Sequence, residues 1–446
     1  MRNLPLCIIA FSLSVATVAA DDSAALRAGN WHQWRGPNAD GVAPLGDPPV
    51  TWDETTNVKW KVGIPGKGTA TPIIWRNKVF VLTAVTTDKV DESKTPPDKQ
   101  PRRPFGIRYP NAYYRFIVMC LDRGTGKVLW RRTAREAVPP EGRHPDNNYA
   151  SASPTTDGKY LYASFGSNGV YCYDLDGKKI WEQDLGDMKT RLSFGGGSSP
   201  VIHGDSLVVN WDHDGPSFIA VLDAKTGRVR WKKPRDEVSA WATPLVVEHK
   251  GVTQVITNAS KRVRSYDLKT GKLLWECGGQ VFNVSPSPVV KEGVVYCMSG
   301  YRGSAAYALP LDATGDITGS DKILWSLKRD TPYLSSPLLY GDLLYFTKSL
   351  GGILSVAEAK TGKIVVRPTR LPGFGRVYAS PAAAAGRIYL QSRGGRTLVL
   401  KHGRKFEVLS SNTIDDYTDA SPAIAGNQIF LRGAKSLYCI EKPSGK

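Results

Sequence analysis

The segment VLDAKTGRVRW, Val221–Trp231, decides the fold that the sequence predicts. An apolar strand ends at Asp223, the chain turns at Thr226 and Gly227, and a second strand ends at Trp231. Glycine supplies the positive φ that a tight strand-to-strand turn needs, and the aspartate can accept hydrogen bonds from the backbone of the turn. A single copy of this segment predicts one β-hairpin.

Copies of this hairpin recur along the chain. They stand at Leu121–Trp130, at Tyr173–Trp181 in a shorter form, and at Tyr266–Trp275; degenerate copies lie at Thr361–Lys363, with Val366 in the tryptophan position, and at His402–Arg404, and a further copy places Trp325 behind a longer loop. One tryptophan at one position of each repeat is what packing between repeats requires. We therefore interpret these tryptophans as structural rather than ligand-binding.

A second marker gives the number of repeats. Ser-Pro or Thr-Pro followed by apolar residues occurs at Pro72, Pro154, Pro200, Pro244, Pro288, Pro337, Pro381 and Pro422. After a first interval of 82 residues, these markers lie 41 to 49 residues apart. A period in the forties, built of short strands and glycine turns, is typical of a propeller with four strands in each blade. We therefore predict an all-β fold, an eight-bladed β-propeller with tryptophan-docking repeats.

The two ends of the repeat region complement each other. Val58–Ile64 resembles the end of a repeat that lacks its beginning, whereas Ser421–Glu441 stops before its tryptophan strand. We expect Val58–Ile64 to complete the last blade, because this pairing closes the ring and removes its open edges.

Four segments organise the chain. Residues 1–20 have one cation, an apolar run and small residues at the end, which is typical of a cleavable secretory signal. Residues 21–57 form an N-terminal arm that contains WHQWRGP, and residues 58–446 form the propeller. Residues 86–114 are an insertion loop in the first blade, with a charged half that we predict to be partly disordered. We expect a periplasmic or secreted protein that does not span a membrane, because no later segment is long and apolar enough.

The charge of the chain favours some classes of binding partner over others. Lys and Arg outnumber Asp and Glu by 59 to 41, a formal net charge of +18. Outside the cytoplasm this charge favours polyanions such as acidic glycans or lipid head groups over nucleic acid, with a solvated basic surface as the alternative. Five cysteines follow the signal segment, and none of them lies in a Cys-x-x-Cys motif. We interpret them as inert core thiols and expect neither haem attachment nor a zinc site.

Cationic side chains recur where a propeller binds its ligands, around one mouth of the central channel. The relevant loops lead into each Ser/Thr-Pro strand or connect the second and third strands of a blade. These loops carry Arg262, Arg302, Lys348, Arg376, Arg393, Arg396 and Arg432. Because Arg and Lys bind carboxylates and phosphates, the sequence predicts an anion site at this mouth. The alternative is that the side chains splay into water, where salt screens them.

Motifs for metal binding or catalysis are absent from the sequence. The segment Asp212–Gly215 (DHDG) resembles a metal loop, but it offers two carboxylates where calcium needs six or more oxygen ligands, so we favour a hairpin turn. His144 and His402 have no visible nucleophile partner. We assign no catalytic residue and no metal site.

The repeat Asp-x-x-Thr-Gly-Lys-x-x-Trp is similar to the tryptophan-docking repeat of pyrroloquinoline quinone (PQQ)-type propellers, from about Val58 to the end of the chain. The segment WHQWRGP also resembles the leader of exported PQQ-like repeat proteins. This resemblance implies a quinoprotein alcohol dehydrogenase-like fold. It implies two kinds of function, that of the quinoprotein dehydrogenases and that of the propeller subunit of outer-membrane β-barrel assembly.

The chain departs from both groups. No two cysteines are adjacent, and the calcium ligands and catalytic aspartate of the dehydrogenases have no residue-by-residue match; the lipidation cysteine of the assembly subunit is missing. We therefore expect an exported, non-catalytic binding or scaffold protein, monomeric, for a protein partner or an anionic small molecule or glycan. The alternative is a PQQ-dependent quinoprotein dehydrogenase that oxidises alcohols, or a degenerate relative, with PQQ as its cofactor.

Overall fold

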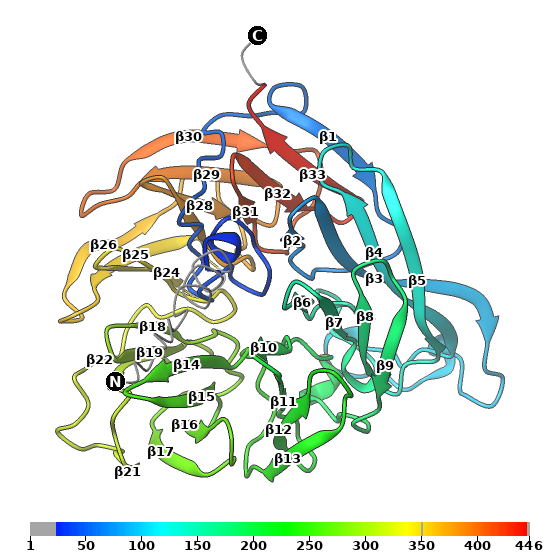
Figure 1. Ribbon diagram of the computed structural model, residues 1–446, viewed down its shortest axis with the longest axis horizontal. Coiled ribbons are helices and arrows are strands. Elements are labelled where there is room, and N and C mark those ends of the chain that lie inside the picture. Colours follow the sequence, from blue (N-terminus) through cyan, green and yellow to red (C-terminus); the bar gives the residue numbers. More distant parts are fainter. Residues whose placement is uncertain (1–23, 349–350, 444–446) are drawn as a thin grey trace, which may run out of the picture.

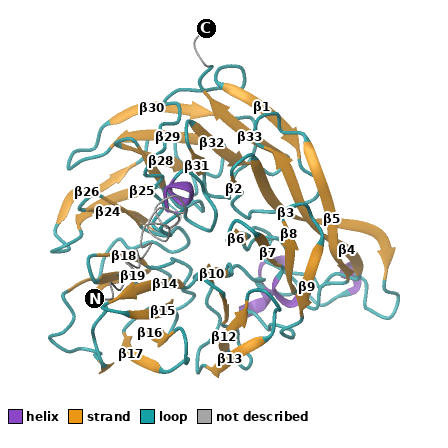
Figure 2. Ribbon diagram, viewed as in Figure 1, coloured by secondary structure: helices purple, strands orange, loops and turns teal. Residues whose placement is uncertain are grey.

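Eight β-sheets form a closed ring, so the predicted eight-bladed β-propeller is confirmed (Figure 1). The structure is a computed structural model that describes residues 24–348 and 351–443. The predicted signal segment, residues 1–20, lies outside the described residues. Within each blade the first strand lies nearest the axis and the fourth at the rim, and the few helical turns lie in loops (Figure 2).

Blades 1 to 4 follow one another along the chain. Their strands are β2 (Ile73–Trp75), β3 (Lys78–Val90), β4 (Ala112–Asp122) and β5 (Val128–Ala137) in blade 1; β6 (Thr155–Thr156), β7 (Tyr160–Ser164), β8 (Val170–Asp174) and β9 (Lys179–Gln183) in blade 2; β10 (Val201–His203), β11 (Ser206–Trp211), β12 (Phe218–Asp223) and β13 (Val229–Pro234) in blade 3; and β14 (Leu245–His249), β15 (Val252–Asn258), β16 (Arg262–Asp267), β17 (Leu273–Gly278) and β21 (Gly315–Asp316) in blade 4.

Blades 5 to 8 continue the ring. Their strands are β18 (Val289–Lys291), β19 (Val294–Ser299), β20 (Ala305–Pro310) and β22 (Trp325–Leu327) in blade 5; β23 (Leu338–Tyr340), β24 (Leu343–Lys348), β25 (Ile353–Glu358) and β26 (Ile364–Arg370) in blade 6; β27 (Ala382–Ala384), β28 (Arg387–Gln391), β29 (Arg396–Lys401) and β30 (Val408–Thr413) in blade 7; and β31 (Ala423–Ala425), β32 (Gln428–Arg432), β33 (Ser436–Glu441) and β1 (Val58–Gly63) in blade 8. Short 3₁₀ turns are η1 (Pro97–Lys99), η2 (Pro104–Gly106), η3 (Gly166–Asn168) and η4 (Arg191–Ser193).

The ring closes as the sequence predicts. Strand β1 pairs antiparallel with β33, with Trp60 opposite Cys439 and Gly63 opposite Ser436. The first strand of the propeller region is therefore the outermost strand of the last blade, and blade 8 has no missing fourth strand.

Each docking tryptophan packs on the glycine turn of the next blade. The indole of Trp60 lies against Gly126, where a Cβ atom would stand 2.8 Å from the ring, and Trp60 Nε1 donates a hydrogen bond to the Arg123 carbonyl at 2.9 Å. Gly126 has a φ of +74°, so both its conformation and the contact exclude a side chain. The same arrangement joins Trp130 to Gly177, Trp181 to Gly227, Trp231 to Gly271 and Trp325 to Gly362.

Trp275 is the exception among the repeat tryptophans. It is fully buried between blades 4 and 5, but its Nε1 donates to Gln254 Oε1 within its own blade. The long connection of blade 5 crosses to blade 4 and adds β21 parallel to β17, with Gly315 opposite Trp275. An extra strand therefore covers Trp275 in place of a glycine turn.

The Ser/Thr-Pro markers form a hydrogen-bonded ring around the channel. From Thr71 to Ser380, the backbone N–H of each marker donates to the hydroxyl of the marker in the next blade at 2.8–3.1 Å, along the series Thr71, Ser153, Ser199, Thr243, Ser287, Ser336, Ser380 and Ser421. Thr71 Oγ1 then donates to the Ser421 carbonyl and completes the circle. The marker hydroxyls therefore satisfy buried backbone donors that the short inner strands leave free.

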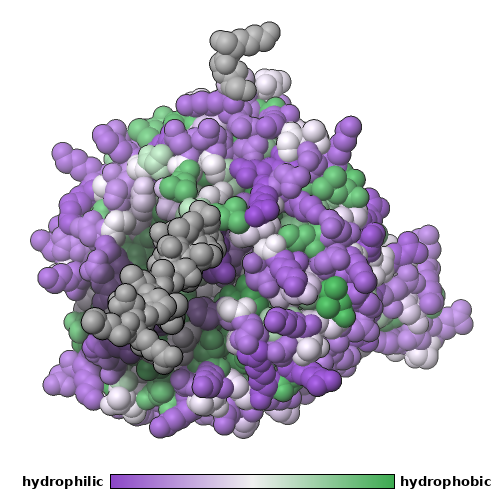
Figure 3. All heavy atoms as spheres, in the orientation of Figure 1, coloured by the Kyte–Doolittle hydropathy of each residue, from purple (hydrophilic) through white to green (hydrophobic). Residues whose placement is uncertain are grey.

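The N-terminal arm occupies the channel from one side, which we call the arm face. Trp31 bridges to Ile74 of blade 1, and Trp34 Nε1 donates to Ser287 Oγ at 3.2 Å. The buried Arg35 guanidinium donates to the carbonyls of Pro337 and Pro381, at the starts of blades 6 and 7. Figure 3, in the orientation of Figure 1, shows mostly hydrophilic side chains over the described part of this face.

The insertion is more regular than the sequence predicts. Its first residues, Thr86–Val90, continue β3 and pair with the extended start of β4 around Ala112. The predicted partial disorder of the charged half is therefore replaced by a lengthened hairpin and two 3₁₀ turns.

The cysteines within the described residues are core thiols, as the sequence predicts. All five cysteines there are free and buried, and burial raises the pKa of the Cys120 and Cys439 thiols to about 12. Low thiolate populations make them unreactive core groups. Among the helices of residues 24–348 and 351–443, none has the length and apolarity that a membrane crossing requires.

Candidate functional site

The face opposite the arm carries all the loops in which the sequence predicts ligand contacts. It consists of the connections that lead into the first strand of each blade and the hairpins between second and third strands, and we call it the loop face. The two kinds of loop contact each other directly, since the N–H of Arg393, in a hairpin, donates to the carbonyl of Arg376, in a connection.

A charged clasp closes the centre of the loop face. Asp146 lies in the connection between β5 and β6, whereas Arg393 follows β28 in blade 7, with blades 8 and 1 between them. Arg393 NH2 nevertheless lies 2.7 Å from Asp146 Oδ1, and its Nε lies 3.1 Å from Asp419 Oδ1. The Tyr378 hydroxyl donates to Asp146 Oδ2 at 2.8 Å. We call Asp146, Tyr378, Arg393 and Asp419 the clasp.

The two clasp carboxylates have pKa values shifted in opposite directions, because their surroundings differ. The hydrogen bond from Arg393 holds the pKa of Asp146 below its ordinary value. Burial raises the pKa of Asp419 to about 7, and the nearby Asp146 charge adds to this shift. Asp146 is therefore the permanent anion of the clasp, while Asp419 titrates near neutral pH.

Of the predicted cations, the structure brings only two together and gives each of the others a separate partner. Arg393 and Arg376 share Asp146, at 2.7 and 3.6 Å, so these two are brought together. The remaining candidates each meet a partner in their own neighbourhood: Arg262 pairs with Asp316, Lys348 with Asp330, Arg396 donates to Ser411, Arg432 is buried and donates to the Gly433 carbonyl, and Arg302 lies over the Tyr301 ring. Whether an anion binds at this mouth stays a prediction.

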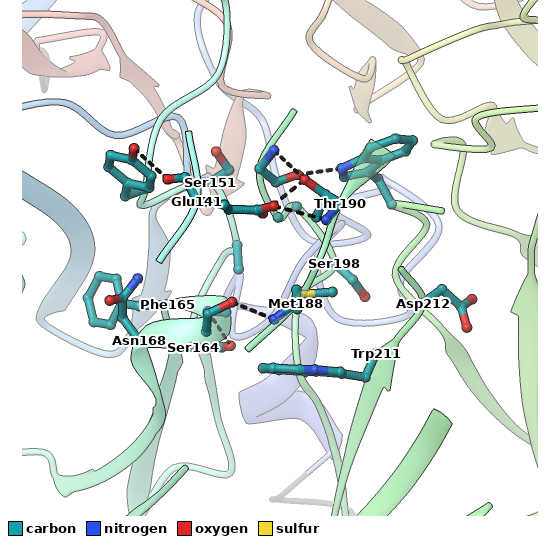
Figure 4. Close-up of a pocket in the computed structure, with 18 of the residues that line it drawn as sticks. Glu141, Ser151, Ser164, Phe165, Asn168, Met188, Thr190, Ser198, Trp211 and Asp212 are labelled. Carbon is teal, nitrogen blue, oxygen red and sulfur yellow. Dashed lines mark hydrogen bonds between the residues drawn. The ribbon is translucent and has the colours of Figure 1, made fainter. Parts of the chain in front are cut away.

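A pocket lies beside the clasp, between blades 2 and 3 (Figure 4). Its walls come from the connections before β6, β10 and β14 and from the hairpins after β7 and β11. Two indoles flank it: Trp241, whose Nε1 donates to the Gly195 carbonyl at 2.7 Å, and Trp211, which stacks on Phe218. The space between these walls is about 50 Å³. That volume holds a few water molecules or one small side-chain group.

Glu141 supplies the negative charge of this pocket. Its two carboxylate oxygens accept hydrogen bonds from the backbone N–H and the hydroxyl of Thr190, both at 2.9 Å. The Thr190 hydroxyl in turn accepts the Gly195 N–H, which fixes the glycine-rich wall of residues 195–197. Burial raises the pKa of Glu141. Glu141 therefore orders the loop that lines the pocket.

The DHDG segment, Asp212–Gly215, is a hairpin turn, as the sequence predicts. Asp212 is turned away from Glu141 (Figure 4), and Arg235 holds its two oxygens at 2.7 and 3.1 Å with both side chains fully buried. Asp214 accepts the Ser239 N–H. Within the described ranges, no group of three or more His, Cys, Asp or Glu side chains is placed to hold a metal ion.

The pocket of Figure 4 does not fit PQQ in this conformation. PQQ is a flat three-ring quinone with carboxylates, so a site for it needs a deep slot and free cations. This pocket measures about 50 Å³, and Arg393 of the neighbouring clasp already binds Asp146 and Asp419. The residues present can hold water or a small polar group between indoles.

Sequence reasoning missed Asp146 and Glu141, the two acids that organise this face. Asp146 directly precedes Asn147, Asn148 and Tyr149, which the sequence does place in a connection at the mouth. No local signal distinguishes it, because its partner comes from blade 7.

Comparison with known proteins places the chain in a family. The family model described as outer membrane protein assembly factor BamB matches residues 115–368, more than half of the 446 residues. A curated relative, tetrathionate hydrolase of Acidithiobacillus ferrooxidans, is 24% identical over 296 residues, which are 61% of this chain and 53% of that protein. The chain thus aligns with about half of the length of that relative.

Two solved structures share the fold. BamB from Moraxella catarrhalis has a TM-score of 0.53 at 15% identity, with 82% of this chain and 99% of that chain covered. A europium-containing methanol dehydrogenase has a TM-score of 0.51 at 12% identity, with 85% and 91% covered. At these identities the likeness concerns the fold alone, and it extends to a protein of each kind. By the match to its family model, the chain belongs to the PQQ-like propeller family described as outer membrane protein assembly factor BamB.

Proposed function

We propose that this chain is an exported, non-catalytic propeller that holds a protein partner on its loop face. The clasp is the observation that carries the proposal. Arg393 and Asp146 join across the mouth at 2.7 Å, so this mouth is closed by the protein's own charges. The arm occupies the channel from the other side through Arg35 and Trp34. We therefore place the partner on the surface of the loop face rather than in the channel.

Exposed apolar side chains on the loop face support a protein partner. Phe282, Phe105, Leu192 and Tyr417 are 65, 58, 48 and 44% exposed. Large apolar groups exposed together on one face are typical of interaction surfaces. The matched family is also described as an outer membrane protein assembly factor, which supports a protein partner.

An acidic ligand or acidic partner group fits the same face. Arg302 is exposed over the Tyr301 ring, and Arg376 keeps a side chain 63% exposed beside Asp146. Their guanidinium heads offer hydrogen bonds to a carboxylate. The predicted anion site thus becomes, in this proposal, the acidic contact of the partner.

PQQ-dependent alcohol oxidation is the alternative. One observation favours it: the pocket of Figure 4 sets two indoles, Trp211 and Trp241, around the acidic Glu141. This alternative requires the clasp to open, because the pocket is too small for the quinone as it stands.

Site-specific photo-crosslinking in the cells that produce the protein tests the proposal. A photoreactive residue replaces Leu192 or Phe282 on the loop face, or Leu45 in the arm as the control, which is 61% exposed. We expect one discrete crosslinked protein from the loop-face positions and none from Leu45. Crosslinks from Leu45 alone, or from none of the three positions, contradict the proposal.

A further inference from the structure

The insertion and the β9–β10 connection, distant in sequence, join on the loop face. Residues 97–110 of the insertion pack against residues 190–197, and the Tyr109 hydroxyl lies 2.8 Å from Ser193 Oγ. The ring of Phe105 lies 5.4 Å from that of Phe194, centre to centre. The insertion is therefore fixed over one side of the pocket of Figure 4.

The two loops and Trp241 of the β13–β14 connection form one apolar patch, which we define as Phe105, Leu192, Phe194 and Trp241. The rings of Phe194 and Trp241 lie 6.4 Å apart, and Trp241 continues into the pocket. The patch thus leads from an exposed rim at Phe105 to the indole at the pocket wall.

Phe105 and Leu192 lie at the rim of the patch, where their backbone conformation and their exposure to water are both unfavourable. They have φ values of +57° and +50°, a region that bulky L-residues avoid, and more than half of Phe105 and nearly half of Leu192 face water. At both positions the backbone conformation is unfavourable, and about half of the apolar side chain stays exposed to water. Such strain is concentrated at binding sites, where it positions a contact group.

Unpaired cations surround the rim of the patch. Residues 97–110 carry four cations, Lys99, Arg102, Arg103 and Arg108, against the single carboxylate of Asp98. Within the described part of the chain, none of the four forms an ion pair. The charge that would complement this rim is negative.

We propose that the apolar patch docks an extended, acidic segment of a partner protein that carries Phe or Leu side chains. The proposal rests on the proposed function and names the site and chemistry of its partner. An apolar side chain of the segment covers Phe105 and Leu192, and its carboxylates meet the cations of the insertion. A flat anionic membrane fits less well, because the patch leads inward from the exposed rim at Phe105 to Trp241 in the pocket wall.

Binding of a labelled peptide to the purified protein tests this inference by fluorescence anisotropy. The probe alternates Phe and Leu with Asp and Glu, and a matched control peptide has Lys at the acidic positions. We expect saturable binding of the acidic probe, weakened by salt, and at least tenfold weaker binding of the Lys peptide. Equal binding of the two peptides, or no binding of the acidic one, overturns the inference.

Four variants separate docking from stability. Phe105→Gly and Leu192→Gly remove the side chain and also relieve the left-handed strain, so the melting temperature should stay or rise while peptide affinity falls about tenfold. Leu45→Ser, in the arm on the opposite face, is the control and should bind like the wild type. Peptide binding that is unchanged in the Phe105 and Leu192 variants but lost in Phe282→Ser overturns this inference and leaves a partner elsewhere on the loop face. Binding of vesicles that contain anionic lipid, if it required Phe105, would assign the patch to a membrane and overturn it as well.

Discussion

Arg393 of blade 7 binds Asp146, in the connection before blade 2, at 2.7 Å, although two blades lie between them. The guanidinium lies between the rings of Tyr378 and Tyr417, at 4.5 and 4.4 Å from their centres. This contact crosses the mouth of the ring, so it restrains blades that share no strand pairing. It also neutralises a cation that an anionic cofactor at this mouth would otherwise use.

Asp419 makes the clasp sensitive to pH. Its folded-state pKa of about 7 lies above the ordinary 3.8, so between these values the folded chain holds a proton that the unfolded chain has released. Stability contributed by this group is therefore greatest near pH 4 and falls as pH rises through 7. We expect Asp419→Asn to flatten the fall in melting temperature between pH 5 and 8. Scanning calorimetry at several pH values would measure this slope, and an unchanged slope would contradict the assignment.

Trp60 tests the closure of the ring. Its indole joins blade 8 to the Gly126 turn of blade 1, so Trp60→Ala should lower the free energy of unfolding by about 3–5 kcal/mol. Gly126→Ala should also destabilise, because its Cβ would stand 2.8 Å from the indole. Leu129→Ala, at an exposed position of the adjacent outer strand, is the control and should change stability by about 0.5 kcal/mol at most. A Trp60 variant as stable as the control would mean that the ring closes without this contact.

The hydroxyl groups of the Ser/Thr-Pro markers should contribute to stability. Ser199→Ala leaves the buried Ser153 N–H without its acceptor, at a cost of about 1–3 kcal/mol. Ser199→Thr keeps the hydroxyl and should recover part of the loss. Ser326→Ala, on the exposed strand β22, should have little effect on denaturant unfolding. Equal midpoints for the Ser199 and Ser326 variants would argue against the hydroxyl ring as a source of stability.

The buried pair Arg235–Asp212 predicts a double-mutant result. Arg235→Met alone leaves the fully buried Asp212 carboxylate uncompensated and should destabilise by about 3–5 kcal/mol. Adding Asp212→Leu removes the orphaned charge and should restore most of that loss. A double variant less stable than the single one would show that the pair contributes more than mutual neutralisation.

The sequence allowed the blades, their number and the closing strand to be predicted because these features are encoded locally and repeated. The markers of neighbouring blades bond to one another, and five docking tryptophans pack on the glycine turn of the next blade. The side-chain directions of the cations could not be predicted in this way. Arg262 turns toward Asp316, which lies on the extra strand β21 that a single blade possesses. The clasp could not be predicted either, because Asp146 and Arg393 become neighbours only when the ring forms.

Titration of the purified protein with PQQ and calcium tests the central claim that the loop face holds a protein partner rather than a quinone cofactor. Quinone absorbance and tryptophan fluorescence report binding, and an artificial dye with added alcohol reports turnover. Because Arg393 is held by Asp146 and Asp419 and the pocket encloses about 50 Å³, we predict no saturable binding and no alcohol-dependent dye reduction. A saturable quinone spectrum with alcohol-dependent reduction, abolished in an Arg393→Met variant, would contradict the account.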